Sequence, residues 1–151
     1  MTAAGRLAEL AALPAAAHEA LCTNCGACCF LTVRIGGGWG NGSTMRCPYL
    51  EGDAPGGYRC TVYADRYARA PWCKPIEAFV AQGAAPRDCP YTSGIDDYQG
   101  STVLTGAEAE RAAHALRGLY AAGRLRVSGS GADDFHRFDR GDARRHLPVA
   151  P

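Results

Sequence analysis

Four of the eight cysteines in this chain stand within eight positions, in the segment CTNCGACC at 22–29. Thiols at this density constrain the fold more than any other feature, because disulfides, a metal or redox chemistry must account for them. Cys22, Cys25 and Cys28 are each separated by two residues, and a loop of this length turns neighbouring thiolates toward one point. The spacing therefore predicts that the segment supplies ligands to a metal.

The rest of the chain is short and rich in residues that favour turns. Its 151 residues include 19 glycines and nine prolines, which indicates long irregular stretches beside the regular elements. A chain of this length forms one domain with a modest hydrophobic core, and a bound metal would stabilise such a core. We therefore expect a small α+β, loop-rich, metal-stabilised single domain with a short β-hairpin and flanking helices.

Composition and spacing divide the chain into four stretches. Every cysteine falls in the second stretch, and the last stretch is polar and broken by glycine. Thr2 is the expected N-cap of the first helix, and Pro14 is expected to end or restart it. The stretches are an N-terminal helix at 1–21, a cysteine-cluster metal-binding core at 22–98, a C-terminal helix packed on the core at 99–127, and a mobile tail at 128–151.

Strands and a short helix are predicted inside the cysteine-rich core. FLTVRI at 30–35 alternates and is rich in β-formers, and it is expected to pair with 43–47 across a wide loop, GGGWGNG. Trp39 in this loop is expected to cover the metal site or to contact a partner. A helix is predicted to begin at Pro75 and to end at Gly83.

The clearest helical pattern lies in the third stretch. It spans 102–123, where Thr105 and Glu108 form a capping box. The spacing of small and apolar residues predicts one buried face. This face consists of Ala109, Ala112, Ala113, Leu116, Leu119 and Tyr120.

Several features favour the cytoplasm as the location of the chain. The N-terminal segment has the apolar character of a signal peptide, but Glu9 interrupts it. No run approaches the roughly 18 apolar residues that cross a bilayer. The net charge of +1 gives no reason to expect nucleic acid or an anionic membrane as a partner, and leaves a protein partner open. In a reducing compartment, clustered cysteines bind metal more often than they form disulfides.

The tripeptide CPY occurs twice and extends the metal-site prediction. It stands at 47–49 and at 89–91, and in each case proline stiffens the chain just after a cysteine. In bacterial ferredoxins, CxxCxxC runs and a cysteine followed by proline supply iron–sulfur ligands. The candidate metal ligands are Cys22, Cys25, Cys28, Cys29, Cys47, Cys60, Cys73 and Cys89.

The adjacent pair Cys28 and Cys29 limits how these ligands are shared. Neighbouring side chains diverge and rarely bind one ion, so one of the two serves the metal. The other serves a second centre, packs in the core or takes part in redox exchange. Eight cysteines would fill two four-thiolate sites, and one centre with several structural or redox cysteines is equally compatible.

The order of these residues resembles the bacterial CxxCxxCC family of zinc- or iron-chelating domains, the YkgJ-like proteins. Tyr67 follows Arg66 where the common family form has proline, as in the YcgN-type branch. Some members are linked to lysine methylation of flagellin, but this chain has little room for an added catalytic domain, and we expect no autonomous catalytic activity. The resemblance covers about positions 18 to 92 and implies a metal-chelating cluster. It is carried by Cys22, Cys25, Gly26, Cys28, Cys29, Cys47, Leu50, Cys60, Tyr63, Arg66, Pro71, Cys73 and Cys89.

Thiolates suit two metals, which leads to two functional hypotheses. Iron, as an iron–sulfur cluster, fits the CxxCxxC spacing and a redox or electron-transfer role. Zinc would instead stabilise a non-enzymatic protein-binding module. We favour iron. A third hypothesis is thiol–disulfide exchange at Cys28 and Cys29.

Other side chains near the cysteines have simpler interpretations. Tyr63 is expected to be a core aromatic residue, and Arg66 to form a salt bridge or to offset the charge of thiolates. His18 is expected to be solvated rather than a ligand. The glycine stretch lacks the GK[ST] ending of a P-loop, and no HExxH or Ser/His/Asp pattern indicates hydrolysis.

Overall fold

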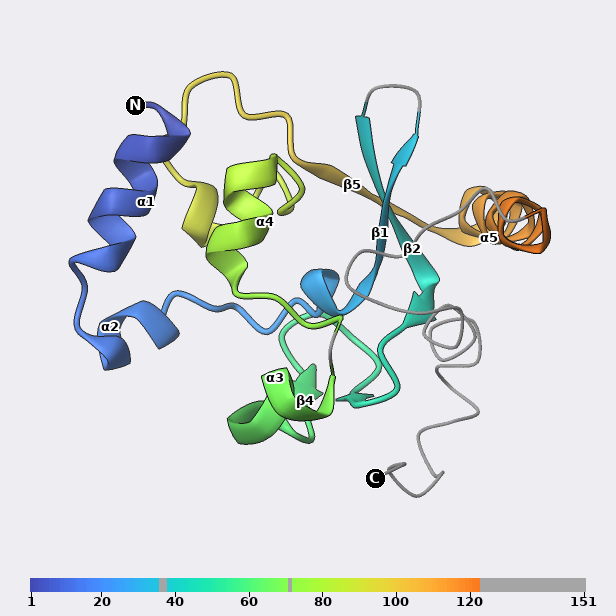
Figure 1. Cartoon of the computed structure of the whole chain (residues 1–151), viewed down its shortest axis with the longest axis horizontal. Helices are drawn as coiled ribbons and strands as arrows, with labels where there is room; N and C mark the ends of the chain where they lie inside the picture. The colour runs from blue at the N-terminus through green and yellow to red at the C-terminus, as the bar shows by residue number, and fades with distance from the viewer. Residues whose placement is uncertain (36–37, 71, 123–151) are drawn as a thin grey trace.

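The structure of the chain is a computed structural model that describes residues 1–35, 38–70 and 72–122. In these residues short helices flank a small sheet, and turns and irregular segments connect them (Figure 1). This arrangement confirms the expected small, mixed α+β, loop-rich fold. No helix in the described part of the chain is long and apolar enough to cross a bilayer. The tail predicted at 128–151 lies outside the described residues.

Two helices occupy the N-terminal stretch, divided at the proline where the helix was expected to end or restart. Helix α1 (Ala3–Ala11) and helix α2 (Ala15–Glu19) are separated at Pro14, which is extended and precedes α2. Proline has no N–H with which to continue the hydrogen bonds of α1, so the helix restarts after it, as predicted. The predicted N-cap is confirmed as well, because the Thr2 hydroxyl accepts the Gly5 N–H over 3.1 Å.

The central sheet contains the glycine-rich stretch that the sequence placed in a loop. Strand β1 (Phe30–Ile35) pairs antiparallel with β2 (Gly38–Arg46), and β5 (Ser101–Leu104) joins β2 in parallel. Leu31 lies opposite Gly42, so the prediction of a wide loop is wrong for residues 38–42, which belong to β2. As the central strand, β2 pairs on both edges, and these backbone hydrogen bonds outweigh the poor strand propensity of glycine.

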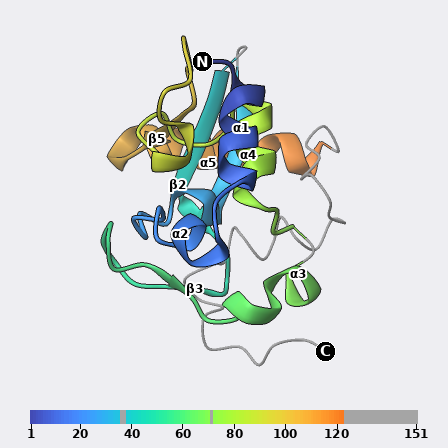
Figure 2. The ribbon, with the colours of Figure 1, turned by 90° about the vertical axis from the view of Figure 1, so that its left-hand side faces the viewer.

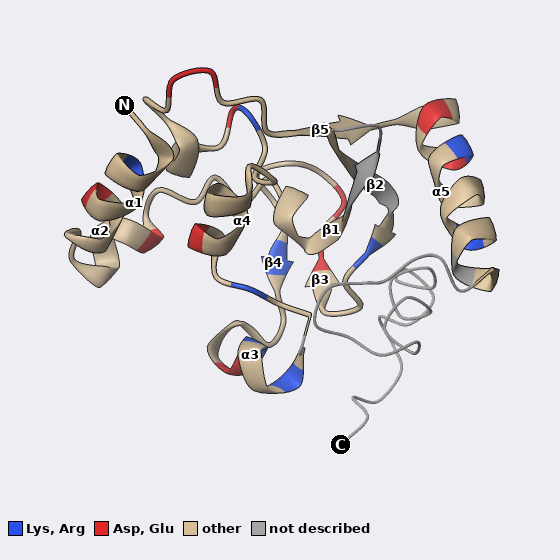
Figure 3. Cartoon of the chain, turned by 45° about the horizontal axis from the view of Figure 1, so that its top comes forward, with Lys and Arg blue, Asp and Glu red and all other residues tan. Residues whose placement is uncertain are grey.

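The C-terminal helix begins later than its sequence pattern predicts. Helix α5 spans Gly106–Ala121, and residues 102–104 belong to β5 instead. Pairing with β2 favours the extended form there, since two of the three residues are β-branched. The predicted apolar face is confirmed at Ala109, Ala113 and Leu116, which are buried, whereas Leu119 is exposed. Helix α5 also contains acidic and basic residues (Figure 3), and these are exposed.

Short elements connect the sheet to the remaining helices. Strands β3 (Leu50–Glu51) and β4 (Arg59–Cys60) pair antiparallel, and helix α3 (Arg66–Arg69) follows them. Helix α4 (Ile76–Gln82) ends at Gly83, which has a φ of +73°. Glycine adopts this left-handed conformation without the steric cost of a side chain, so the predicted helix end is confirmed.

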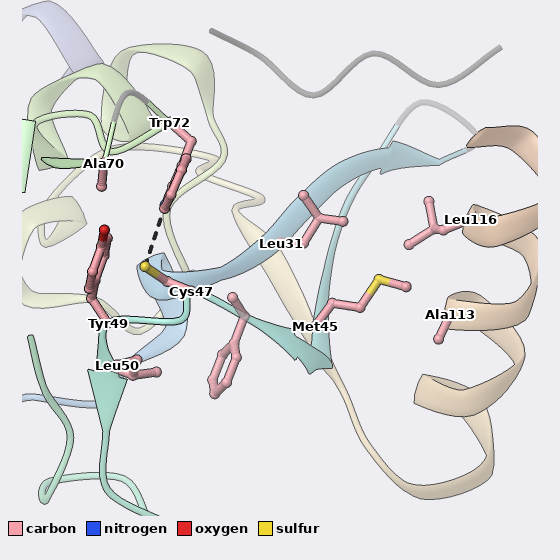
Figure 4. Packing of buried hydrophobic residues seen from close by; sticks show 10 residues of the cluster. Leu31, Met45, Cys47, Tyr49, Leu50, Ala70, Trp72, Ala113 and Leu116 are labelled. Atoms are coloured by element: carbon pink, nitrogen blue, oxygen red, sulfur yellow. Dashed lines mark hydrogen bonds between the residues drawn. The ribbon is translucent and has the colours of Figure 1, made fainter. Parts of the chain in front are cut away.

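Buried apolar residues form two clusters that hold these elements together. The first core lies between the sheet, α5 and the segment around Trp72 (Figure 4). The second core lies between α1, α4 and the turn at Pro90–Thr92, and α1 and α4 lie side by side (Figure 2). The first core consists of Phe30, Leu31, Met45, Cys47, Tyr49, Leu50, Ala70, Trp72, Ala113 and Leu116. The second consists of Leu10, Val80, Ala85 and Tyr91.

Candidate metal centre

All eight cysteines line a common cavity. The cavity has a volume of about 480 Å³, and its walls come from segments as far apart as His18 and Tyr91. The cysteines are all free thiols, and Cys47 is the only buried one among them. The fold therefore brings every residue predicted as a metal ligand to the same space.

The thiols share this cavity without converging on a single point. In the described residues, no group of three or more Cys, His, Asp or Glu side chains is placed to hold a metal ion. A four-thiolate zinc site needs sulfur atoms about 2.3 Å from the metal. The donor set is chemically suited to iron or zinc, and the segments that carry the thiols would have to draw closer to complete a ligand shell.

The segment CTNCGACC turns sharply at its centre. Gly26 has a φ of +73° and precedes a 3₁₀ turn at Ala27–Cys29. A Cβ atom at this glycine would lie 2.5 Å from the ring of Tyr58, so both the conformation and the close packing require glycine. The Cys29 N–H donates to the Gly26 carbonyl over 2.9 Å. The turn thus fixes where Cys25 and the cysteine pair leave the backbone.

Backbone N–H groups point at three of the cysteine sulfurs in the same way. The N–H of Asn24 donates to Cys22 Sγ over 3.5 Å. In the two CPY motifs, the N–H of Tyr49 donates to the sulfur of Cys47, and the N–H of Tyr91 to that of Cys89. In each case the donor is two residues beyond the cysteine. Such donors stabilise thiolates and tune metal–sulfur centres.

Cys28 and Cys29 differ in their acidity. The thiol of Cys29 donates a hydrogen bond to the sulfur of Cys28, which lowers the pKa of Cys28 to about 7. The positive charge of Arg66 acts in the same direction. The same hydrogen bond, together with burial, raises the pKa of Cys29 well above its usual value. Cys28 is also exposed, so it is the cysteine best prepared to react as a thiolate.

Burial keeps four further cysteines protonated near neutral pH. It raises the pKa of Cys73 and of Cys89 to about 11, and it also raises the pKa of Cys22 and Cys47. A metal binds thiolates, so metal binding at these residues would release protons. Cysteines in this state are inert until a metal replaces the proton.

Tyr63 departs from its predicted environment, and Arg66 lies against its ring. Tyr63 is exposed rather than part of the core, and its hydroxyl donates to Glu19. The guanidinium of Arg66 lies 3.9 Å from the ring centroid of Tyr63 and 4.5 Å from that of Tyr67. It donates to the Tyr63 carbonyl over 2.6 Å. The charge of Arg66 lowers the pKa of the neighbouring thiols Cys28 and Cys73, which agrees with the predicted offset of thiolate charge.

His18 and Trp39 also line the cavity. His18 is half-buried rather than solvated, because its ring lies 5.0 Å from that of Tyr91 and its Nε2 lies 2.8 Å from Oε1 of Glu77. The indole of Trp39 donates to the carbonyl of Gln82 over 3.2 Å. Trp39 therefore covers one side of the cavity, which was one of its two predicted roles.

Sequence reasoning missed Trp72 as a contributor to the site. Its indole N–H donates to Cys47 Sγ over 3.4 Å, and its ring is buried in the first core. The only signal in the sequence was its position directly before Cys73. A tryptophan next to a cysteine is ordinary core composition, so spacing alone does not reveal this contact.

The fold and the cavity define a small, loop-rich α+β protein whose cysteines share one space. Comparison with protein-family models, curated proteins and solved structures finds no match. The similarity to the CxxCxxCC family therefore stays a prediction that depends on the cysteine spacing and its neighbouring residues. What the chain does must be inferred from the cavity itself.

Proposed function

We propose that this chain is a metal-chelating protein of the CxxCxxCC type, which binds iron as an iron–sulfur cluster through cysteine thiolates. The bound iron would serve a redox or electron-transfer role. The observation that carries the proposal is the cavity of about 480 Å³ that all eight cysteines line. Soft thiolate ligands select iron–sulfur clusters and zinc, and four of them complete a shell for either.

The N–H donors favour iron over zinc. The N–H groups that point at Cys22, Cys47 and Cys89 are of the kind that tunes iron–sulfur potentials. The alternative, a zinc-stabilised binding module, would contact a partner through Trp39, the long helix or the tail, and of these Trp39 is half-buried.

Metal and acid-labile sulfide analysis of anaerobically purified protein tests the proposal. Iron with matching sulfide, a visible absorption band and bleaching by dithionite would support it. Zinc without sulfide would favour the binding module, and protein without either metal would overturn both. In the variant Cys25→Ser we expect no metal loading, whereas Thr23→Ser in the same loop should load like the unmodified chain.

A second candidate function is thiol–disulfide exchange, which the hydrogen bond between Cys29 and Cys28 favours. The Cys28 thiolate would attack a substrate disulfide and release one thiolate. The Cys29 sulfur would then displace the other, which leaves the substrate reduced and the pair oxidised. This function needs no metal. It predicts that metal-free protein stays folded and loses two free thiols on mild oxidation, and that Cys29→Ser stops at the mixed disulfide.

A further inference from the structure

The two cores divide the cysteines into two sets. Cys47 belongs to the first core, and Cys29, Cys60 and Cys73 pack against it. Cys89 packs against the second core instead. The division was not visible in the sequence, because Cys29 is adjacent to Cys28 and Cys73 is nearer in sequence to Cys89 than to Cys47.

Hydrogen bonds and strand pairing tie the first set together. The N–H of Cys47 donates to the carbonyl of Cys29 over 2.7 Å, which joins the end of CTNCGACC to the first CPY motif. Cys60 stands opposite Leu50 in the β3–β4 pair, and Leu50 is three residues after Cys47 in the sequence. The indole of Trp72, the residue before Cys73, donates to Cys47 Sγ. Cys29 and the neighbour of Cys73 therefore contact Cys47 directly. Cys60 is linked to Cys47 through Leu50, whose N–H donates to the Cys47 carbonyl over 3.0 Å.

Different contacts join the remaining cysteines. The Tyr91 hydroxyl donates to the carbonyl of His18 over 2.8 Å, which links the second CPY motif to the chain that leads into CTNCGACC. Leu21, the residue before Cys22, packs against the second core together with Cys89. Cys22 and Cys25 stand in one CxxC loop, and their charges raise the pKa of Cys89.

Cys28 stands at the boundary between the two sets. The charge of Cys28 raises the pKa of Cys22 and Cys89 in one set, and it also raises the pKa of Cys47 and Cys73 in the other. The adjacent Cys29 is held in the first set by its carbonyl and its packing. The thiol of Cys29 donates to the sulfur of Cys28, so the two sulfurs lie close together where the sets meet. Cys28 completes the CxxCxxC run with Cys22 and Cys25. It is therefore left to the second set, and each set then has the four thiolates that a complete centre needs.

We infer that the chain builds two metal centres, divided at the peptide bond between Cys28 and Cys29. The inference rests on the proposed function, since both centres need thiolates that bind metal. The first centre is held by Cys29, Cys47, Cys60 and Cys73. The second centre is held by Cys22, Cys25, Cys28 and Cys89.

Metal analysis of single-cysteine variants tests the division. Cys60→Ser should empty the first centre and Cys89→Ser the second, so each variant should keep about half of the metal if the centres are alike. Whether or not the centres are alike, the metal contents of the two single variants should add up to the metal content of the unmodified chain. The double variant should contain no metal. If both single variants lose all metal while remaining folded by circular dichroism, a single shared centre replaces the inference. An unmodified chain without metal would overturn the proposed function as well.

The cysteine pair gives the sharpest comparison. Cys28→Ser should lose the same fraction of metal as Cys89→Ser, and Cys29→Ser the same as Cys60→Ser. The double variant Cys28→Ser/Cys89→Ser should keep the metal of the first centre, whereas Cys29→Ser/Cys89→Ser should hold none. Equal metal content in these two double variants would contradict the division. Thr61→Ser is the control, because it keeps the hydroxyl that donates to the Tyr49 carbonyl and lies beside Cys60.

A measurement on the unmodified chain covers the case in which a variant fails to fold. Metal-free protein is titrated with Co²⁺ under anaerobic conditions and followed by native mass spectrometry and by the thiolate-to-cobalt absorption. Two centres predict species with one and then two cobalt ions per chain, with the absorption still rising during the second addition. A titration that ends at one cobalt ion per chain would contradict the inference, and one without any binding would count against the proposed function itself.

Discussion

Nε1 of Trp72 lies 3.4 Å from Sγ of Cys47, and the two side chains are buried together in the first core (Figure 4). The ring of Tyr49 stacks on the indole, with an interplanar angle of 9°. Burial raises the pKa of the Cys47 thiol, while the indole N–H and a backbone N–H act in the opposite direction. The packing of the core and the chemistry of the cavity are therefore coupled at this sulfur.

Replacing Trp72 with phenylalanine should destabilise the core and also remove a hydrogen bond that lowers the pKa of the Cys47 thiol. The change removes the N–H donor and part of a buried ring, so we expect the free energy of unfolding to fall by about 1–3 kcal/mol. Urea unfolding of metal-free protein measures this. Trp39→Phe is the control, since its indole donates to the Gln82 carbonyl nearer the surface, and its loss should be smaller. Equal losses would contradict the coupling described above.

In metal-free protein, the cysteines should react with iodoacetamide in an order set by their acidity. A pKa of about 7 makes Cys28 about nine-tenths thiolate at pH 8, whereas a pKa of about 11 leaves Cys73 and Cys89 about one part in a thousand ionised. The Cys28 rate should rise up to about pH 8 and then level off. The other two rates should keep rising toward pH 11. Peptide mass spectrometry after timed quenching reports each rate.

Arg66 should tune the acidity of Cys28 through its charge. Arg66→Gln removes a positive charge that lowers the pKa of this thiol, so the midpoint of its alkylation profile should move to higher pH by about a few tenths of a unit. Arg69→Gln, on the same short helix, is the matched control because Arg69 pairs with Asp65 at 3.6 Å. A midpoint that stays fixed in Arg66→Gln, or shifts equally in both variants, would exclude the electrostatic role.

The fold could be predicted where local chemistry decides the structure. The break at Pro14 and the helix end at Gly83 follow from one missing N–H and one left-handed residue, and both were visible in the sequence. The central strand was not, because GGGWGNG becomes β2 only through pairing with β1 and β5. Residues 102–104 were assigned to a helix for the same reason. Their partner lies some 60 residues earlier in the chain, at 40–42.

The candidate site could also be predicted only in part from the sequence. The chemistry of thiols and the CxxCxxC spacing identified every cysteine that lines the cavity. The grouping of these cysteines depends on which core each one packs against, and sequence distance gives no guide to that. Trp72 and Tyr58 escaped notice because their contacts with Cys47 and Gly26 arise only when distant segments meet.

A pair of glycine variants should separate the cost of backbone strain from the cost of crowding. Gly26 and Gly83 share a φ of +73°, so alanine at either position adopts an unfavourable left-handed conformation that costs about 1–2 kcal/mol. At Gly83 an added Cβ would meet no atom within 4 Å, whereas at Gly26 it would lie 2.5 Å from the ring of Tyr58. That ring makes an edge contact with Phe30 of the first core and has little room to move.

We therefore expect Gly83→Ala to lower the free energy of unfolding by about 1–2 kcal/mol, and Gly26→Ala by roughly a further 1–3 kcal/mol through overpacking. Urea unfolding of metal-free protein measures both. Because the displaced turn carries Cys25 and Cys28, Gly26→Ala should also lower the metal content, while Gly83→Ala should leave it unchanged. Equal losses of stability in the two variants would show that the Tyr58 ring yields to the added methyl group. Unchanged metal content in Gly26→Ala would show that this turn does not position the cysteines.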